Sequence, residues 1–192
     1  MYDTWIPEDI EKAADKIKSG GLILYPTDTI WGIGCNATNA DAILRVNRVK
    51  DRPPGKPLVI LVDSIPMLKE FARDVHPRVE TLLEFHNKPL TVIYPVTTGL
   101  PDMLKAPDGS IGIRITHDPF CKALIGLSGC PLVSTSANQA GQPFPNTFGE
   151  VSSIIIKGVD YVCKYKQGSR DFQPPSVIAT FDKSGAFKFI RE

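Results

Sequence analysis

The sequence predicts an α/β fold formed by a single domain over residues 1–192. Apolar runs of strand length alternate with segments whose apolar residues recur at helical spacing, and this alternation indicates a sheet covered by helices. The last strands are joined by short connections, which a parallel pair of strands cannot use, so the sheet is not purely parallel. A chain of 192 residues fits one domain of ordinary size, and we therefore do not divide it.

The first quarter of the chain predicts two helices and a strand. A helix that ends at Gly20 precedes a strand over residues 22–25. The small and hydroxylated residues 27–34 then indicate a loop, because they are poor core material. Thr38 or Asn39 caps the next helix. The apolar residues that define the two helices are Ile10, Ala13, Ala14 and Ile17 in the first, and Ala42, Ile43 and Val46 in the second.

The rest of the chain continues the alternation. Helices are expected where a capping residue precedes apolar residues at helical spacing, beginning at Ser64, His76 and Asp118. Thr147 and Glu150 have capping-box spacing and predict a further helix. The remaining strands are expected at residues 58–62, 90–96, 110–116, 131–133, 159–163, 176–181 and 186–190.

Composition excludes several classes of protein. The formal net charge is +1, from 22 basic and 21 acidic residues, so no global field attracts nucleic acid or a membrane surface. No apolar run approaches membrane-spanning length, and we expect a soluble, cytoplasmic protein. The cysteines are scattered without metal-ligand spacing, so we expect reduced, buried thiols and no protein-bound metal. They are Cys35, Cys121, Cys130 and Cys163.

A cluster of cations follows the second predicted helix. Lys50, Arg52 and Lys56 lie within seven residues, and Pro53 favours an extended conformation at Arg52. In an extended segment residues two apart share a face, so Lys50 and Arg52 are expected to reach one anion together. The alternative is that both cations only stabilise a helix C-terminus, where positive charge is worth about 0.3–1 kcal/mol.

A second polar motif follows the apolar residues 131–133. Ser134, Ser136 and Asn138 lie two apart and leave the end of a strand together. The alternative is an ordinary turn whose side chains bind their own backbone.

Together these motifs resemble those of the YrdC-like family of threonylcarbamoyl-AMP synthases. The resemblance rests on the YPTDT sequence with its following glycines, on K-x-R, on KPL and on S-x-S-A-N, and it extends to two closing segments. These motifs occupy residues 25–34, 50–52, 56–58, 134–138, 175–178 and 189–191. The resemblance implies a twisted, mixed, open sheet with a concave basic cavity, in the compact bacterial form.

The resemblance also implies an activity and its site residues. The family joins L-threonine, bicarbonate and ATP into threonylcarbamoyl-AMP and pyrophosphate, with Mg²⁺ carried by ATP. A separate transferase complex then modifies the tRNA adenosine beside the anticodon. The implied catalytic residues are Lys50, Arg52, Ser136 and Asn138. The implied ATP contacts are these four with Lys56, Ser110 and Arg191. The implied threonine contacts are Thr29, Arg114, Ser134 and Ser176.

The residues themselves suit this chemistry. Attack on the α-phosphate of a nucleotide requires cations that hold the phosphates and offset the charge on departing pyrophosphate. No Walker sequence is present, so a P-loop enzyme is excluded. Arg114 lies in an alternating strand, on the face opposite Ile113 and Ile115, and its planar fork matches a carboxylate. No histidine is assigned as a general base.

Two other functions remain open. One is an RNA-binding module of the same fold that uses the charge of the cavity, with weak RNA binding and no synthase activity. The other is a carbamoyl-handling enzyme, such as the related domain of hydrogenase-maturation proteins. The near-neutral composition and the complete S-x-S-A-N motif argue against the first, and the absence of accompanying zinc-finger cysteines argues against the second.

Overall fold

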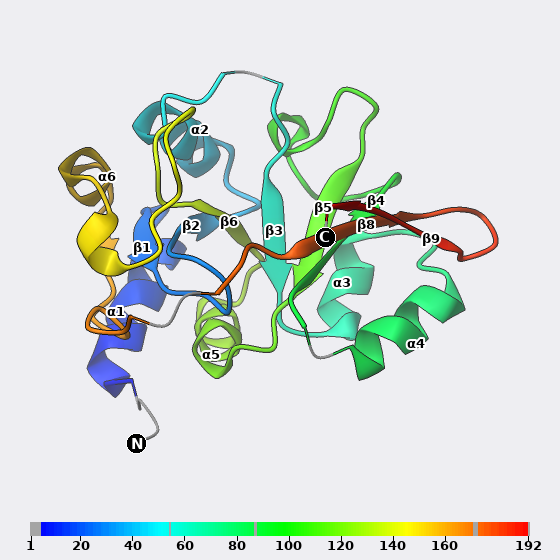
Figure 1. Cartoon of the computed structure of the whole chain (residues 1–192), viewed down its shortest axis with the longest axis horizontal. Coiled ribbons are helices and arrows are strands. Elements are labelled where there is room, and N and C mark those ends of the chain that lie inside the picture. Colours follow the sequence, from blue (N-terminus) through cyan, green and yellow to red (C-terminus); the bar gives the residue numbers. More distant parts are fainter. Residues whose placement is uncertain (1–4, 54, 87, 171–172, 192) are drawn as a thin grey trace.

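The strands of the chain form one mixed sheet (Figure 1). The computed structural model describes residues 5–53, 55–86, 88–170 and 173–191. In these residues the strand order is β7-β1-β2-β6-β3-β5-β4-β8-β9. The pairs β1–β7, β3–β5 and β4–β8 are parallel and the other neighbours antiparallel, which confirms the predicted mixed sheet. The strands are β1 Ile23–Tyr25, β2 Gly32–Asn36, β3 Val59–Val62, β4 Leu90–Tyr94, β5 Ile111–Ile115, β6 Leu132–Ser136, β7 Tyr161–Val162, β8 Val177–Phe181 and β9 Phe187–Arg191.

The helices begin mostly at the predicted capping residues. The side chains of Asn39, Ser64 and Asp118 accept hydrogen bonds from the first turns of α2, α3 and α5. The helices are α1 Pro7–Lys18, α2 Ala40–Val49, α3 Ile65–Phe71, α4 Pro77–Phe85, α5 Pro119–Ser128 and α6 Ser153–Gly158, with short 3-10 turns η1 Asp102–Leu104 and η2 Phe148–Glu150.

The predicted capping box was wrong in its role. Thr147 and Glu150 bracket the turn η2, and a Glu150 carboxylate oxygen accepts the N–H of Asn146 at 2.8 Å. The helix α6 starts later, where the Ser152 hydroxyl accepts the N–H of Ile155 at 3.4 Å. Thr147 and Glu150 therefore enclose a single turn, and Ser152 caps the helix.

The predicted loop over residues 27–34 was also wrong at its C-terminal end. Gly32 opens the strand β2, which pairs with β1 so that Gly34 lies opposite Ile23 and Gly32 opposite Tyr25. A Cβ atom at Gly34 would lie 2.7 Å from Cε1 of Tyr25. Gly34 is therefore required by the tyrosine ring that packs over this strand, and its small size does not indicate a loop.

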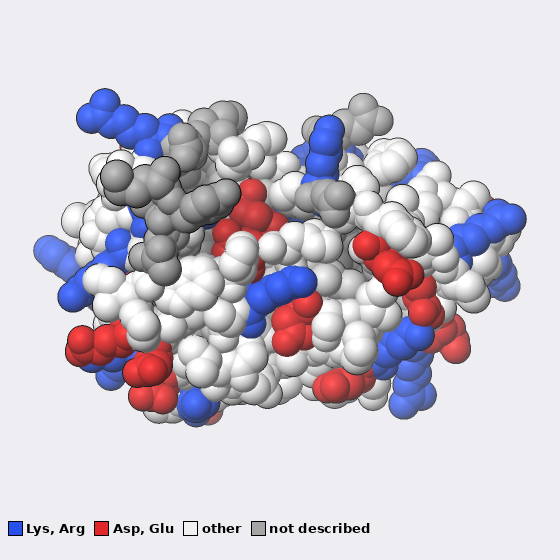
Figure 2. Space-filling model, turned by 90° about the horizontal axis from the view of Figure 1, so that it is seen from below, with Lys and Arg blue, Asp and Glu red and all other residues white. Residues whose placement is uncertain are grey.

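The surface shows no field of one sign on the side seen in Figure 2. Lysine and arginine side chains are interspersed there with aspartate and glutamate side chains. Each helix in the described part of the chain is too short or too polar to span a bilayer.

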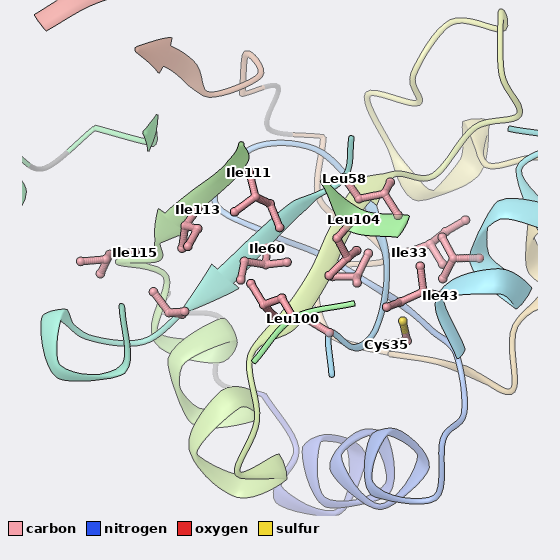
Figure 3. Packing of buried hydrophobic residues seen from close by; sticks show 14 of the residues in the cluster. Ile33, Cys35, Ile43, Leu58, Ile60, Leu100, Leu104, Ile111, Ile113 and Ile115 are labelled. Atoms are coloured by element: carbon pink, nitrogen blue, oxygen red, sulfur yellow. The ribbon is translucent and has the colours of Figure 1, made fainter. Parts of the chain in front are cut away.

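Apolar side chains pack on both faces of the sheet. On one face Ile23, Leu61 and Leu132 pack against α1 and α5. On the other face residues of β2, β3 and β5 pack with α2 and η1. Figure 3 shows Ile33, Ile60 and Ile113 of these strands in one cluster with Ile43 of α2 and Leu104 of η1.

Alternation along the strands decides which polar residues share a face. Arg114 lies between Ile113 and Ile115, so it projects on the face that carries Leu61, its neighbour in register. Ser134 and Ser136 follow Leu132 at intervals of two and project on this same face. The sheet therefore places these polar side chains on the face that α1 and α5 cover elsewhere.

Candidate active site

A cavity of about 290 Å³ lies over this polar part of the sheet. Its lining comes from the loop between β1 and β2, from the segment between α2 and β3, from β2, β3, β5 and β6, and from the open end of the β8–β9 hairpin, where β8 begins and β9 ends. The predicted site residues that line it are Thr29, Arg52, Arg114, Ser134, Ser136, Ser176 and Arg191. Segments separated by most of the chain thus contribute to one cavity.

Arg114 is the most buried of the cationic residues in this wall. It is 4% exposed, and its Nη2 atom lies 3.2 Å from Oδ1 of Asp28 without hydrogen-bond geometry. Its Nη1 donates a hydrogen bond to the Thr29 hydroxyl at 3.3 Å. Its Nε is buried and has no hydrogen-bond partner in the described part of the chain. The guanidinium therefore keeps donor capacity for an acceptor that enters the cavity.

Two further guanidinium groups reach the cavity. Arg191 donates hydrogen bonds from Nε and Nη2 to the carbonyl of Ser176, at 3.2 and 2.7 Å. Burial and the charge of Arg114 lower its pKa. Arg52 donates from Nη2 to the carbonyl of Pro57 at 2.8 Å, and burial lowers its pKa. Because desolvation and like charge disfavour these cations, an anion bound among them would be favoured.

Hydroxyl groups complete the wall. Thr27 Oγ1 lies 2.9 Å from Thr29 Oγ1 and accepts the N–H of Thr29 at 3.0 Å, which fixes the loop before β2. The hydroxyls of Ser176 and Thr91 are 2.8 Å apart and buried. These groups can donate or accept, so the cavity offers neutral hydrogen-bonding groups beside its cations.

Lys50 does not occupy the predicted extended segment. It ends α2 with φ −84° and ψ −5°, and Asp51 follows with φ 48°. The N–H of Arg52 bonds the carbonyl of Asn47 at 2.9 Å, and that of Asp51 bonds Arg48 at 3.1 Å, which is a Schellman ending. The prediction that Lys50 and Arg52 share a face is therefore wrong, because the helix ending turns the chain at Asp51, before Pro53.

The Lys50 side chain is buried and makes backbone contacts. It is 2% exposed, and Nζ donates to the carbonyl of Ser136 and to that of Asn138, the latter at 2.6 Å. Burial and the charge of Arg52 lower its pKa to about 7. Lys50 is absent from the residues that line the cavity.

Three other predicted contacts lie outside the cavity lining. Lys56 is exposed. The Ser110 hydroxyl donates to Asp108 at 2.7 Å. Asn138 lines a second cavity of about 370 Å³, where its side-chain nitrogen donates to the carbonyl of Gln142. The structure does not bring these three side chains to the wall that holds the arginines.

Sequence reasoning missed two residues of the site. Asp28 is the ionic partner of Arg114, and Phe144 lines both the first and the second cavity. The signal for Asp28 was its place inside the YPTDT sequence, next to the predicted contact Thr29. Phe144 follows Pro143 in a loop, and we found no pattern that would have identified it.

The described residues contain no group of three or more His, Cys, Asp or Glu side chains able to hold a metal ion. All four cysteines are free and buried, as predicted.

The relationship to known proteins is clear over most of the length. Residues 15–192 match the Sua5/YciO/YrdC family, whose description is "Telomere recombination". The chain belongs to this family. It is 34% identical over 170 residues to a threonylcarbamoyl-AMP synthase from Stutzerimonas stutzeri, which covers 88% of this chain and 90% of that protein. A protein of the same name from Pseudomonas paraeruginosa is 35% identical over 168 residues, with 86% and 89% covered.

Solved structures of family members share the fold. Sua5 of P. abyssi, in a complex with L-threonine, aligns with a TM-score of 0.80 and 27% identity, over 90% of this chain and 50% of that one. This chain thus spans about half of that Sua5. YciO of E. coli aligns with a TM-score of 0.84 and 24% identity, over 99% and 91% of the two chains, and supports the fold alone. These likenesses agree with the predicted twisted, mixed sheet covered by helices.

Proposed function

We propose that this member of the family is a threonylcarbamoyl-AMP synthase, which forms threonylcarbamoyl-AMP and pyrophosphate from L-threonine, bicarbonate and ATP. The observation that carries the proposal is the convergence of Arg52, Arg114 and Arg191 on one cavity with the hydroxyls of Ser134 and Ser136. Curated relatives of this name, at 34 and 35% identity, support the same conclusion.

Arg114 and its neighbours suit the amino acid. A free amino acid brings a carboxylate into the cavity, and a desolvated carboxylate needs a charged partner. Arg52 and Arg114 both keep an Nε donor without a partner among the described residues, and Arg114 is the more buried of the two. Thr29 and Ser176 supply hydroxyl groups near Arg114. The P. abyssi Sua5 structure contains L-threonine, which supports an amino-acid site in this fold.

Arg52, with Ser136, suits the nucleotide. In the first step the amino nitrogen of threonine bonds to the bicarbonate carbon, and water is lost. In the second step an oxygen of the new carboxylate bonds to the α-phosphorus of ATP, and pyrophosphate leaves. Negative charge grows on the departing phosphates, and fixed cations stabilise it. Arg52 lines the cavity, and it forms no ion pair with a carboxylate among the described residues.

Mg²⁺ enters as part of the Mg·ATP substrate in this proposal. Mg²⁺ commonly keeps several waters and binds through substrate phosphates, so a dedicated protein cage is not required. The lack of a metal-holding group among the described side chains fits a metal that arrives with the phosphates.

The product would pass to a separate transferase complex that modifies tRNA, and the chain would act in the cytoplasm, where that tRNA is found. No RNA contact is needed for synthesis itself. The mixed surface charges in Figure 2 give no specific support to an RNA-binding role on that face.

The test is pyrophosphate release from Mg·ATP by the purified protein, with each substrate omitted in turn. We expect release that requires both threonine and bicarbonate, with a product whose mass matches threonylcarbamoyl-AMP. Release of pyrophosphate with carbamoyl phosphate in place of bicarbonate, and no need for threonine, would support carbamoyl handling instead. RNA binding without any pyrophosphate release would support the RNA-binding module.

A further inference from the structure

Lys50 is a buried lysine without a carboxylate partner. Its side chain is 2% exposed, and no ion pair within the described residues includes it. A buried ammonium group is costly unless its N–H groups are hydrogen-bonded. The acceptors that Lys50 has are backbone carbonyls, those of Ser136 and Asn138.

These contacts hold the segment 136–140 from more than one side. The Lys50 side chain binds two carbonyls of the segment, and the carbonyl of Lys50 accepts the N–H of Ala140 at 2.7 Å. On the other side the N–H of Ala137 donates to the carbonyl of Trp31 at 2.9 Å. The end of α2 therefore fixes the backbone that carries Ser136 and Asn138.

The direction of the side chain matters for its role. Lys50 is not in the lining of the cavity, whereas Arg52, two residues later, is. Arg52 is the charged group that faces Lys50 closely enough to lower its pKa, together with burial. The Lys50 ammonium group is bound by the carbonyls of Ser136 and Asn138, whereas Arg52 reaches the cavity.

We propose that Lys50 is a positioning residue, which fixes Ser136 and Asn138 through their carbonyls and makes no contact with the nucleotide. The phosphates are then bound by Arg52. The role given to Ser136 and Asn138 in catalysis rests on the proposed function, but the attachment of the segment 136–140 to Lys50 does not.

The first experiment compares the steady-state kinetics of Lys50→Met and Arg52→Met. Methionine keeps much of the apolar stem and removes the donor. For Lys50→Met we expect kcat to fall about tenfold or more, with KM for Mg·ATP within about twofold of the wild type, as for a displaced catalytic group. For Arg52→Met we expect KM for Mg·ATP to rise about tenfold or more, because a charged hydrogen bond to substrate is lost.

The second experiment does not depend on activity. Hydrogen exchange of the amides of residues 136–140 should accelerate in Lys50→Met by about tenfold or more, because two buried carbonyls lose their donor. The same amides should keep their wild-type protection in Arg52→Met. If Lys50→Met does not fold, Lys50→Gln is used with the same expectation, because its side chain is too short to reach both carbonyls.

The outcomes separate the two proposals. Unchanged exchange at residues 136–140 in the Lys50 variant, with a raised KM for Mg·ATP, would overturn the positioning role and return Lys50 to the phosphates. A wild-type protein without synthase activity would overturn the proposed function. In that case faster exchange in the Lys50 variant would still support the attachment, and unchanged exchange would refute it.

Discussion

Arg114 in β5 and Asp28 in the loop after β1 form an ion pair at the cavity wall, with Nη2 3.2 Å from Oδ1. Their side chains are 5% and 15% exposed. A charge in the middle of a strand of isoleucines required a partner, and the structure supplies it from a loop 86 positions earlier (114 minus 28). Asp28 supplies the counter-charge and the Thr29 hydroxyl accepts from Nη1, while Nε stays without a partner among the described residues.

Replacement of Arg114 by lysine should weaken threonine binding selectively. An ammonium group keeps the charge but cannot form two parallel hydrogen bonds to a carboxylate. We expect KM for threonine to rise about tenfold or more and KM for Mg·ATP to change by less than about threefold. Calorimetry with each substrate checks this. Weaker binding of ATP alone would assign Arg114 to the phosphates.

Replacement of Asp28 by asparagine should reduce stability. The change keeps the shape of the side chain and leaves the buried Arg114 without its counter-charge. We expect the free energy of unfolding to fall by about 2 kcal/mol, less than for a fully buried pair, because Asp28 is partly exposed. Urea denaturation measures this loss. In the matched control Asp102→Asn, at an exposed ion pair, the change should be below about 0.5 kcal/mol, and an equal loss in both variants would contradict the prediction.

Lys50 should make stability depend on pH near neutrality. Its pKa is about 7 in the folded protein, because of burial and Arg52, against about 10.4 for a lysine in an unfolded chain. Between these values the unfolded state binds more protons, so the free energy of unfolding rises with pH, by at most about 1.4 kcal/mol per pH unit. Urea denaturation at pH 7 and pH 8.5 should show this rise in the wild type and a smaller one in Lys50→Met. An exposed control, Lys122→Met, should behave like the wild type, and equal slopes in all three proteins would refute the prediction.

Replacement of Gly34 by alanine should destabilise the sheet. The new Cβ would lie 2.7 Å from the Tyr25 ring and 3.2 Å from the carbonyl of Val133. Overpacking of this kind costs about 1–3 kcal/mol. In the control Gly126→Ala, an exposed position of α5 with no atom within 4 Å of the new Cβ, stability should rise by up to about 1 kcal/mol. Thermal unfolding compares the two, and a stable Gly34→Ala would mean that the tyrosine ring moves freely.

The thiols should be unreactive in the native protein. Burial raises the pKa of Cys35, Cys121, Cys130 and Cys163, so little thiolate is present and none is exposed. Labelling with a disulfide reagent at neutral pH should be slow until denaturant is added, and all four should then react. Rapid labelling of any one cysteine under native conditions would reveal local opening at its position.

Local signals in the sequence were sufficient for much of the fold. Short polar residues before apolar periodicity located the caps Asn39, Ser64 and Asp118, because capping depends on a few adjacent residues. The strand that carries Arg114 was predicted from alternation, which is equally local. The strand before Ser134 was predicted from its apolar residues 131–133, but β6 continues to Ser136, because its polar end pairs with β2.

The rest depended on contacts between distant residues. Gly34 was assigned to a loop because its need for a small residue comes from the Tyr25 ring on the neighbouring strand. Lys50 was predicted to bind an anion together with Arg52, but its side chain binds carbonyls of the distant segment 136–140. Asp28 could be recognised as a partner of Arg114 only once β5 was known to lie beside that loop. Such pairings are fixed by tertiary packing, which neither periodicity nor local propensity encodes.

The spread of the cavity wall along the chain also bears on folding and synthesis. Thr29 and Arg191 line the same cavity, so the binding site exists only after strands from both ends of the chain have joined the sheet. Closing such long loops is the slow part of folding for proteins with distant contacts. A ribosome-bound chain that has emerged only through β6 would lack Ser176 and Arg191, so its cavity would be incomplete. In the complete chain, a ligand at one hundred times its Kd would stabilise the entire fold by about 2.7 kcal/mol. Because its cavity joins segments from both ends of the chain, the ligand would also slow proteolysis at sites far from the cavity.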